Sequence, residues 1–163
     1  MDTFDREKAL RVWRRVRGTP EEPRIAQLIQ EELTDAAALA SLARRFPGSR
    51  GQQLARMARQ DREHAARLKG MLSVTQGGPL RFRAASLPLE RTESLLRRCL
   101  ERKQRRTELY GAMGNDPRFG SLWQTLAARE EAHCVTLLEL LGTVSPPDSA
   151  PRTRRPQRRR RWR

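Results

Sequence analysis

Four segments of this chain repeat their apolar side chains at the three- and four-residue spacing of an α-helix. They cover about residues 23–46, 52–74, 88–114 and 117–142, and Gly or Pro separates each from the next. No segment alternates apolar and polar residues in the manner of a strand. Because each apolar stripe must be buried, the pattern predicts an all-α domain whose helices cover one another's apolar faces.

The connections between these segments predict how the helices are joined. The stretch "PGSRG" makes a short turn after the first helix, and "NDP" makes another before the fourth. In the latter, Asp116 is a good N-cap and Pro117 suits the first helical position. The stretch "TQGGPLRFRAAS", between the second and third helices, is long and irregular. Short, long and short connections are typical of a four-helix bundle with one long crossover connection.

The two ends of the chain differ from the bundle, which we place at residues 22–142. Residues 1–18 form a short amphipathic pattern, with Phe4, Ala9, Trp13 and Val16 roughly on one side. Residues 145–163 carry eight Arg against one Asp, and so supply +7 of the net charge of +15. This segment has several prolines and almost nothing to bury, so we expect a disordered basic tail.

Composition and the first residues exclude several classes of protein. The N-terminal stretch "MDTFDREKAL" is acidic where a secretory signal is basic and then apolar. No apolar run approaches the ~18 residues of a membrane span. Cys99 and Cys134 form no C-x-x-C pair, which argues against a rubredoxin-type iron centre or a zinc ribbon. Reduced thiols are typical of the cytoplasm, where we expect the protein to be located.

Ionisable residues interrupt the apolar stripes of three of the four helices. Glu32 lies in the stripe of the first helix, Asp61 and His64 in that of the second, and Glu130 and His133 in that of the fourth. An acid and a histidine three residues apart leave the same face of a helix. Burial of such groups costs several kcal/mol unless they are paired, hydrogen-bonded or bound to a metal. The pattern therefore predicts a polar or metal-binding core.

The third helix departs from this pattern. Its two-helix unit looks like a copy of the first unit, with Tyr110 corresponding to Leu39. Seven residues before Leu39 stands Glu32, whereas seven residues before Tyr110 stands Lys103. Three inward carboxylates and one ammonium sum to −2, which matches one divalent ion, or none if the histidines and Lys103 complete an ion-pair network. On the solvent side we place the remaining acids near these positions, namely Glu31, Asp35, Glu63, Glu101, Glu108 and Glu131.

Between about Pro23 and Gly142 the chain resembles the ferritin-like, rubrerythrin-type proteins. The resemblance rests on "IQEELTDAAALASLA", "MARQDREHAARL", "ERKQRRTELYGAM" and "LAAREEAHCVTLL". In that family a four-helix bundle holds two irons, through a Glu from helices one and three and a Glu-x-x-His from helices two and four. The ligand set implied by the resemblance is Glu32, Asp61, His64, Glu130 and His133, with Asp61 where Glu is usual and Lys103 at the helix-three position.

The resemblance implies redox chemistry on iron with peroxide or oxygen, in a variant site that holds one or two ions. Manganese and zinc suit the same ligand types. Tyr110 would donate a hydrogen bond to a ligand or simply pack. The alternative is a non-catalytic, metal-free bundle whose core is an ion-pair network and whose function is association. A third hypothesis is nonspecific binding of nucleic acid or another polyanion by residues 145–163, with Trp162 available for stacking. Catalysis and a homodimer both stay open.

Overall fold

The computed structural model describes residues 21–76, 81–84, 86 and 90–144, and within these ranges it contains helices and no strand. The predicted N-terminal helix and the Arg-rich tail lie outside the described residues. The helices are α2 (Glu21–Ala43), α3 (Gly48–Gln76), α4 (Thr92–Ala112) and α5 (Gly120–Val144). The prediction of an all-α chain is confirmed for the described part. No helix there is long and apolar enough for a membrane span.

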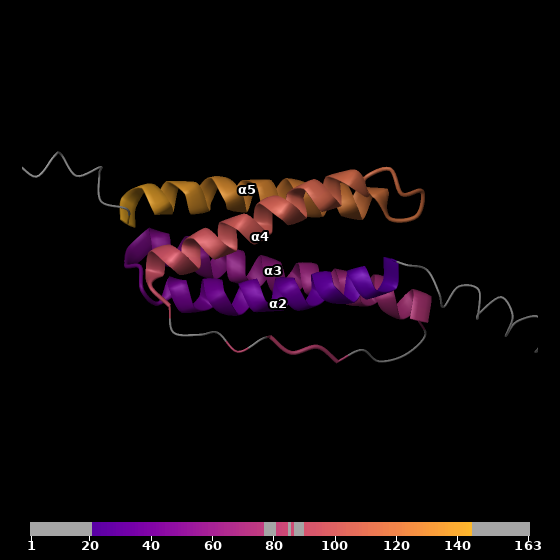
Figure 1. Ribbon diagram of the computed structural model, residues 1–163, viewed down its shortest axis with the longest axis horizontal. Coiled ribbons are helices and arrows are strands. Elements are labelled where there is room, and N and C mark those ends of the chain that lie inside the picture. The colour runs from indigo at the N-terminus through magenta and orange to yellow at the C-terminus, as the bar shows by residue number, and fades with distance from the viewer. Residues whose placement is uncertain (1–20, 77–80, 85, 87–89, 145–163) are drawn as a thin grey trace, which may run out of the picture.

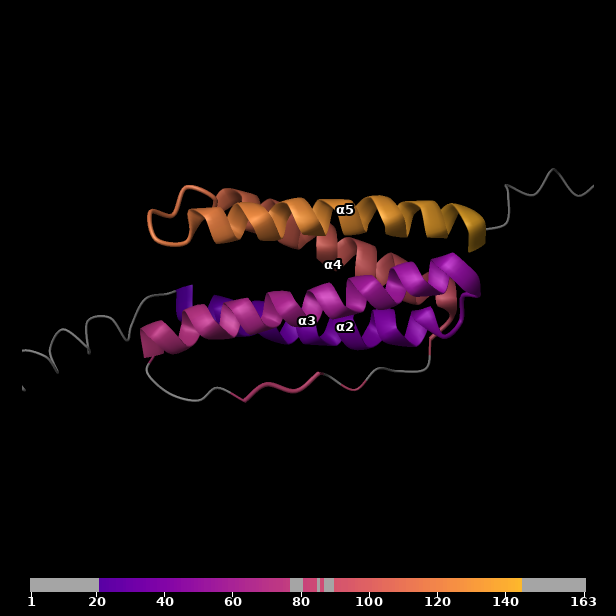
Figure 2. The same cartoon turned by 180° about the vertical axis from the view of Figure 1, so that it is seen from behind.

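The helices form two hairpins that lie against each other. Helix α2 pairs with α3 and α4 pairs with α5, as Figure 1 shows. The same pairing is visible from behind in Figure 2, where α3 and α4 run in the same direction along the bundle. Helix α3 therefore ends at the opposite end of the bundle from the start of α4. The connection between them has to cross the length of the bundle, as its irregular sequence predicts.

The first residues of α3 and α4 differ from those predicted from the sequence. Helix α3 starts at Gly48, inside the predicted turn, where Gly48 has a φ of 63°. Gly51 is buried there, and a Cβ on it would come within 2.3 Å of the Phe46 carbonyl oxygen. A glycine at position 51 therefore allows the first turn of α3 to lie against the backbone of Ala43 and Phe46. Helix α4 starts at Thr92 rather than at Pro88, which lies outside the described residues.

The start of α5 also differs, although the capping residue is as predicted. Asp116 Oδ1 accepts hydrogen bonds from the backbone N–H groups of Arg118 and Phe119, at 2.7 and 3.0 Å. These bonds close a turn before the helix rather than its first turn, so α5 begins at Gly120. At its other end α5 continues through Gly142 to Val144, because glycine is tolerated inside a helix at a cost of about 1 kcal/mol.

The apolar core consists of two clusters, one toward each end of the bundle. One is formed by Ala38, Leu39, Leu42, Leu54, Met57, Ala58, Leu95, Leu96, Cys99, Leu100, Cys134, Leu137, Leu140 and Leu141. The other is formed by Leu28, Ile29, Ala65, Leu68, Met71, Leu72, Tyr110, Trp123 and Leu126. In each cluster all four helices contribute side chains. Between the clusters lies a layer of buried charged groups.

Candidate functional site

Eight polar or charged side chains are buried in the middle of the bundle, and we call them the polar layer. They are Glu32, Asp35, Asp61, His64, Lys103, Arg106, Glu130 and His133. The layer contains all five candidate ligands predicted from the sequence, and it contains Lys103. The other two members, Asp35 and Arg106, were not predicted to be there. Whether the five candidates bind a metal stays a prediction.

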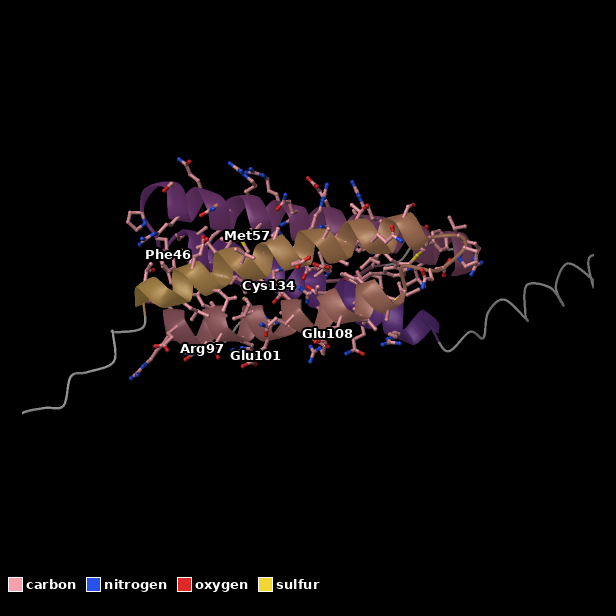
Figure 3. The ribbon with its side chains drawn as sticks, turned by 90° about the horizontal axis from the view of Figure 1, so that it is seen from above. Phe46, Met57, Arg97, Glu101, Glu108 and Cys134 are labelled. Atoms are coloured by element: carbon pink, nitrogen blue, oxygen red, sulfur yellow. The ribbon has the colours of Figure 1, made fainter. Side chains whose placement is uncertain are left out.

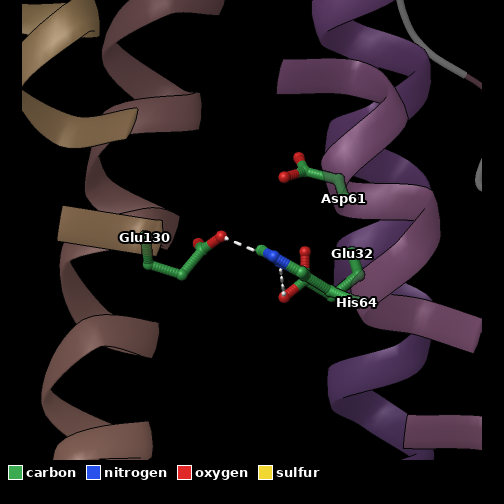
Figure 4. A group of neighbouring side chains, drawn as sticks. All are labelled: Glu32, Asp61, His64 and Glu130. Carbon is green, nitrogen blue, oxygen red and sulfur yellow. Dashed lines mark ion pairs between the residues drawn. The ribbon is translucent and has the colours of Figure 1, made fainter. Parts of the chain in front are cut away.

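Glu32, Asp61, His64 and Glu130 converge on one point of the layer. Each offers a donor atom, and these atoms all lie within 4.8 Å of one another. Figure 4 shows His64 between the carboxylates of Glu32 and Glu130. The Nδ1 atom of His64 lies 3.5 Å from Glu32 Oε1 and 3.4 Å from Glu130 Oε1. Helices α2, α3 and α5 therefore bring their inward ionisable groups together.

The two carboxylates set the protonation of His64. Burial alone would lower the pKa of this imidazole, but the carboxylates of Glu130 and Glu32 outweigh burial and raise the pKa from 6.5 to about 9. Burial raises the pKa of Glu32 above its ordinary value, although Arg106 opposes the shift. In the metal-free protein at neutral pH, His64 is therefore a cation that balances one of the neighbouring carboxylates.

Lys103 reaches the layer from α4 and contacts two carboxylates. Its Nζ donates to Asp61 Oδ1 and Oδ2, both at 2.9 Å, and to Glu130 Oε1 and Oε2 at 3.2 and 3.4 Å. Burial alone would lower the pKa of Lys103, but Asp61 and Glu130 outweigh burial and raise it. Burial alone would raise the pKa values of Asp61 and Glu130. Lys103 has the opposite effect, and the pKa values of both carboxyl groups lie below the ordinary range. The lysine is a charged member of the core, as its register predicts.

Arg106, one turn after Lys103, is the residue that the sequence analysis missed. It is fully buried, and its Nε and Nη2 lie 3.1 and 3.0 Å from Glu130 Oε2. Nη2 also donates to Asp35 Oδ2 at 2.6 Å, and Nε lies 3.6 Å from Glu32 Oε1. The available signal was the spacing from Lys103, since residues three apart share a helix face. Arginine is rarely buried without partners, so this spacing alone does not predict a buried guanidinium.

The expected solvent exposure of Asp35 is wrong. Asp35 is fully buried and accepts hydrogen bonds from Arg106 and from Arg102 Nε, the latter at 2.7 Å. Two guanidinium groups offset the cost of taking this carboxylate out of water. The other acids placed on the solvent side are exposed, except that Glu31 is half-buried. Figure 3 shows two of them, Glu101 and Glu108, with Arg97 on the outer side of α4.

His133 occupies the position that corresponds to His64, but in different surroundings. Its Nε2 lies 2.7 Å from the side-chain oxygen of Gln60, which identifies a hydrogen bond. Its Nδ1 lies 3.3 Å from Asp61 Oδ1 and 3.7 Å from Glu130 Oε1. The rings of His64 and His133 are stacked, with their centroids 6.1 Å apart. His133 therefore faces the carboxylates that Lys103 already binds.

Tyr110 both packs and donates a hydrogen bond, the two alternatives that its sequence position left open. Its hydroxyl donates to Glu32 Oε1 at 2.8 Å, and its ring stacks on Trp123 with centroids 5.6 Å apart. Burial and the nearby Glu32 carboxylate raise the pKa of Tyr110 well above its ordinary value. The phenol therefore stays protonated and fixes the orientation of Glu32.

Three buried polar atoms at the centre of the layer have no hydrogen-bond partner among the described residues. They are Glu32 Oε2 and both ring nitrogens of His64, and Arg106 Nη1 and His133 Nδ1 elsewhere in the layer also lack a partner. Buried polar groups in native proteins are almost always satisfied, so such atoms call for an explanation. All three belong to the group of donors that converge, and both residues are fully buried. A cation bound at this point would satisfy Glu32 Oε2 and one ring nitrogen of His64, because an imidazole binds one metal ion through one nitrogen and keeps its proton on the other.

The charges of the layer balance without a metal when His64 is protonated. Asp35 pairs with Arg102, so these two cancel. The remaining carboxylates are Glu32, Asp61 and Glu130, and the remaining cations are Lys103, Arg106 and His64. These sum to zero. The sequence-based sum of −2 was wrong because it omitted Arg106 and treated His64 as neutral.

The residues present do not fit two metal ions. Lys103 Nζ lies between Asp61 and Glu130, and an ammonium has three protons and no lone pair for a metal. They do fit one ion at Glu32, His64 and Glu130. Donor atoms about 2.1 Å from one ion lie within about 4.2 Å of each other, and His64 Nδ1 lies 3.5 and 3.4 Å from carboxylate oxygens of Glu32 and Glu130.

Comparison of the chain with protein-family models, with curated proteins and with solved structures finds no match. The function is therefore argued from the polar layer itself.

Proposed function

We propose that this protein is a ferritin-like, rubrerythrin-type bundle that binds one divalent metal ion, through Glu32, His64 and Glu130. Iron is the first choice, with manganese and zinc as the alternatives that suit two carboxylates and an imidazole. The observation that carries the proposal is that Glu32 Oε2 and the ring nitrogens of His64 are buried and unsatisfied, so that the carboxylate and one of these nitrogens can both bind an ion. Lys103 takes the place of a second ion, because it balances Asp61 and Glu130 with a fixed positive charge.

The surrounding residues would prepare this site for a cation. Tyr110 holds Glu32 Oε1 by its hydrogen bond, which leaves Oε2 to bind the ion. Lys103 and Arg106 hold Glu130 in its ionised form. His64 would release its proton from the nitrogen that binds, so one divalent cation replaces one proton and the charge of the layer changes by +1. Bound iron would supply one-electron chemistry toward peroxide or oxygen, as the resemblance implies.

The first experiment measures the metal itself. Protein purified without chelator is analysed for iron, manganese and zinc, and the metal-free form is then titrated anaerobically with each ion. We expect saturation at one ion per chain, accompanied by release of about one proton per ion near pH 7.5. Saturation at two ions per chain would contradict the role of Lys103.

The two histidines provide a matched pair of variants. His64→Gln should weaken metal binding by more than about 100-fold, since it removes a ligand and not merely a supporting group. His133→Gln changes the same residue type at the corresponding position, and it should leave the affinity within about threefold. Equal losses in both variants would reject the proposed ligand set.

The contacts of Lys103 and Arg106 favour a second candidate, a metal-free bundle with a structural ion-pair network. In this case the protonated His64 completes the balance of charge, and the function is association rather than chemistry. The two candidates differ in one measurement. Absence of iron, manganese and zinc after aerobic and anaerobic preparation, together with no uptake on titration, would favour the network.

A further inference from the structure

A pocket of about 420 Å³ opens between α2 and α4, away from the point where the candidate ligands converge. Arg24, Gln27, Leu28 and Glu31 line it from α2, and Arg105, Arg106, Glu108 and Leu109 line it from α4. Its volume lies in the range of small-molecule sites. Three of its lining side chains are arginines, and two leucines supply apolar surface. The pocket therefore combines anion-binding groups with an apolar wall.

Arg106 belongs to the polar layer and also lines this pocket. Nε and Nη2 bind Glu130 and Asp35 on the inner side. Nη1 is buried and has no hydrogen-bond partner among the described residues. The nearby Glu31 Oε2 lies 3.7 Å from it, which is beyond hydrogen-bonding distance. A fully buried guanidinium thus offers an unused donor at the wall of the pocket.

Glu31 is the internal group that an added anion would replace. Its Oε2 lies 3.5 Å from Arg105 Nη2 as well as near Arg106, so it contacts both arginines without an ideal hydrogen bond to either. The Glu31 side chain is 17% exposed and that of Arg105 is 63% exposed. Both can move without disturbing the core, and a ligand could then bind between the two guanidinium groups.

We propose that the pocket binds a small organic monocarboxylate with a short apolar body. A carboxylate matches the fork of a guanidinium and would use Arg106 Nη1 and Arg105 together. Because Arg106 already balances the polar layer, Arg24 and Arg105 oppose Glu31 and Glu108 in the lining. Once Glu31 has moved out of the pocket the lining sums to +1, so a monoanion balances it better than a phosphate dianion. Leu28 and Leu109 would cover the apolar part of the ligand. This inference does not depend on whether the polar layer binds metal.

The test uses isovalerate as the probe and isovaleramide as its neutral isostere, with binding followed by amide resonances of the full-length protein. We expect saturable shifts near Leu28 and Leu109 with isovalerate, and at least tenfold weaker binding of isovaleramide. Equal binding of the two probes would overturn the proposal. Saturation by inorganic phosphate with no response to isovalerate would also overturn it, because it would assign the pocket to a different anion.

Substitutions on the exposed side of the pocket should raise or lower the affinity for isovalerate without disturbing the core. Arg105→Gln should weaken isovalerate binding roughly tenfold, whereas Arg97→Gln, on the same helix but outside the lining, should leave it within twofold. Glu31→Gln removes the competing carboxylate and should strengthen binding by about threefold or more. Unchanged affinity in Arg105→Gln, or weaker binding in Glu31→Gln, would refute the site.

Discussion

The two hairpins of the bundle place corresponding side chains in the polar layer, but with opposite charge on their first helices. Helix α2 contributes Glu32 and Asp35, and α4 contributes Lys103 and Arg106 at the equivalent positions. The second helices remain alike, since each contributes an acid and a histidine three residues apart. Two acidic first helices would have given two equivalent half-sites for metal. Instead, the acidic side chains of α2 face the basic side chains of α4.

This difference changes what holds the hairpins together. Lys103 binds Asp61 and Glu130, so one ammonium joins α3 and α5 through α4. Arg106 joins α2 to α5 in the same way, through Asp35 and Glu130. Buried atoms remain unsatisfied in both halves, namely Glu32 Oε2 and the ring nitrogens of His64 in one half and Arg106 Nη1 and His133 Nδ1 in the other. Lysine and arginine bind the carboxylates in one half of the layer, and the other half is where we propose that a metal ion binds.

The largest effect is expected from Lys103→Glu, which would give both hairpins an acid at the corresponding position. The core charge changes by −2, and four carboxylates then crowd around Arg106 and His64. The metal-free variant should lose more than the roughly 3–5 kcal/mol typical of a broken buried ion pair, as measured by urea unfolding with chelator present. Added Mn²⁺ or Fe²⁺ should recover stability by mass action, with stoichiometry that rises toward two per chain. A variant that melts like the parent, with and without metal, would contradict the comparison.

Lys103→Met removes the ammonium and retains the bulk of the side chain. Asp61 is left with His133 alone, and Glu130 with Arg106 and the two histidines, so unfolding in urea should show a loss of about 3–5 kcal/mol. No second metal site should form, because no ligand is added. The control is Arg97→Met on the exposed side of α4, which should change the free energy of unfolding by no more than about 0.5 kcal/mol. Equal stability of the two variants would mean that Lys103 is not essential to the layer.

The pH dependence of the metal-free protein tests the protonated His64. Its folded pKa of about 9 lies above its ordinary value of 6.5. The contribution to stability is therefore complete below pH 6.5 and is lost as the pH rises through about 9, a change of roughly 3 kcal/mol. Glu32 and Glu130 face the ring, and Lys103 and Arg106 stay charged across this window. Urea unfolding of the parent and of His64→Gln at pH 6 and pH 9 measures the difference, and parallel pH profiles would refute it.

The smallest effect is expected from Tyr110→Phe, which removes a contact that only one half of the layer has. The corresponding residue of α2 is Leu39, which has no hydroxyl. Loss of the hydrogen bond to Glu32 should cost about 1.5–3 kcal/mol, as for other bonds to charged groups. If Tyr110 orients Glu32, metal affinity should also fall, by about tenfold. A change in stability without any change in affinity would restrict the Tyr110 hydroxyl to a structural role.

The sequence predicted the helices and the five inward candidates because apolar stripes at helical spacing place each of these residues among side chains that must be buried. It predicted Lys103 because the two hairpins align. It failed at Asp35 and Arg106, which the alignment pairs with each other. The sequence pattern placed Asp35 on the solvent side and made no prediction for Arg106. Each can be buried because it contacts the other across 71 residues of sequence. Such mutual compensation has no signal within a single helix.

The polar layer also determines how the helices are aligned along the bundle. Apolar clusters lie on both sides of it, and a helix that slid by one turn would move its side chains by about 5.4 Å. A slip of α4 would carry Lys103 and Arg106 toward leucines and leave Asp61 and Glu130 without cations. Apolar packing alone discriminates weakly between such registers, because one leucine readily replaces another. The buried charges thus destabilise shifted alignments of the two hairpins and favour a single packing of the chain.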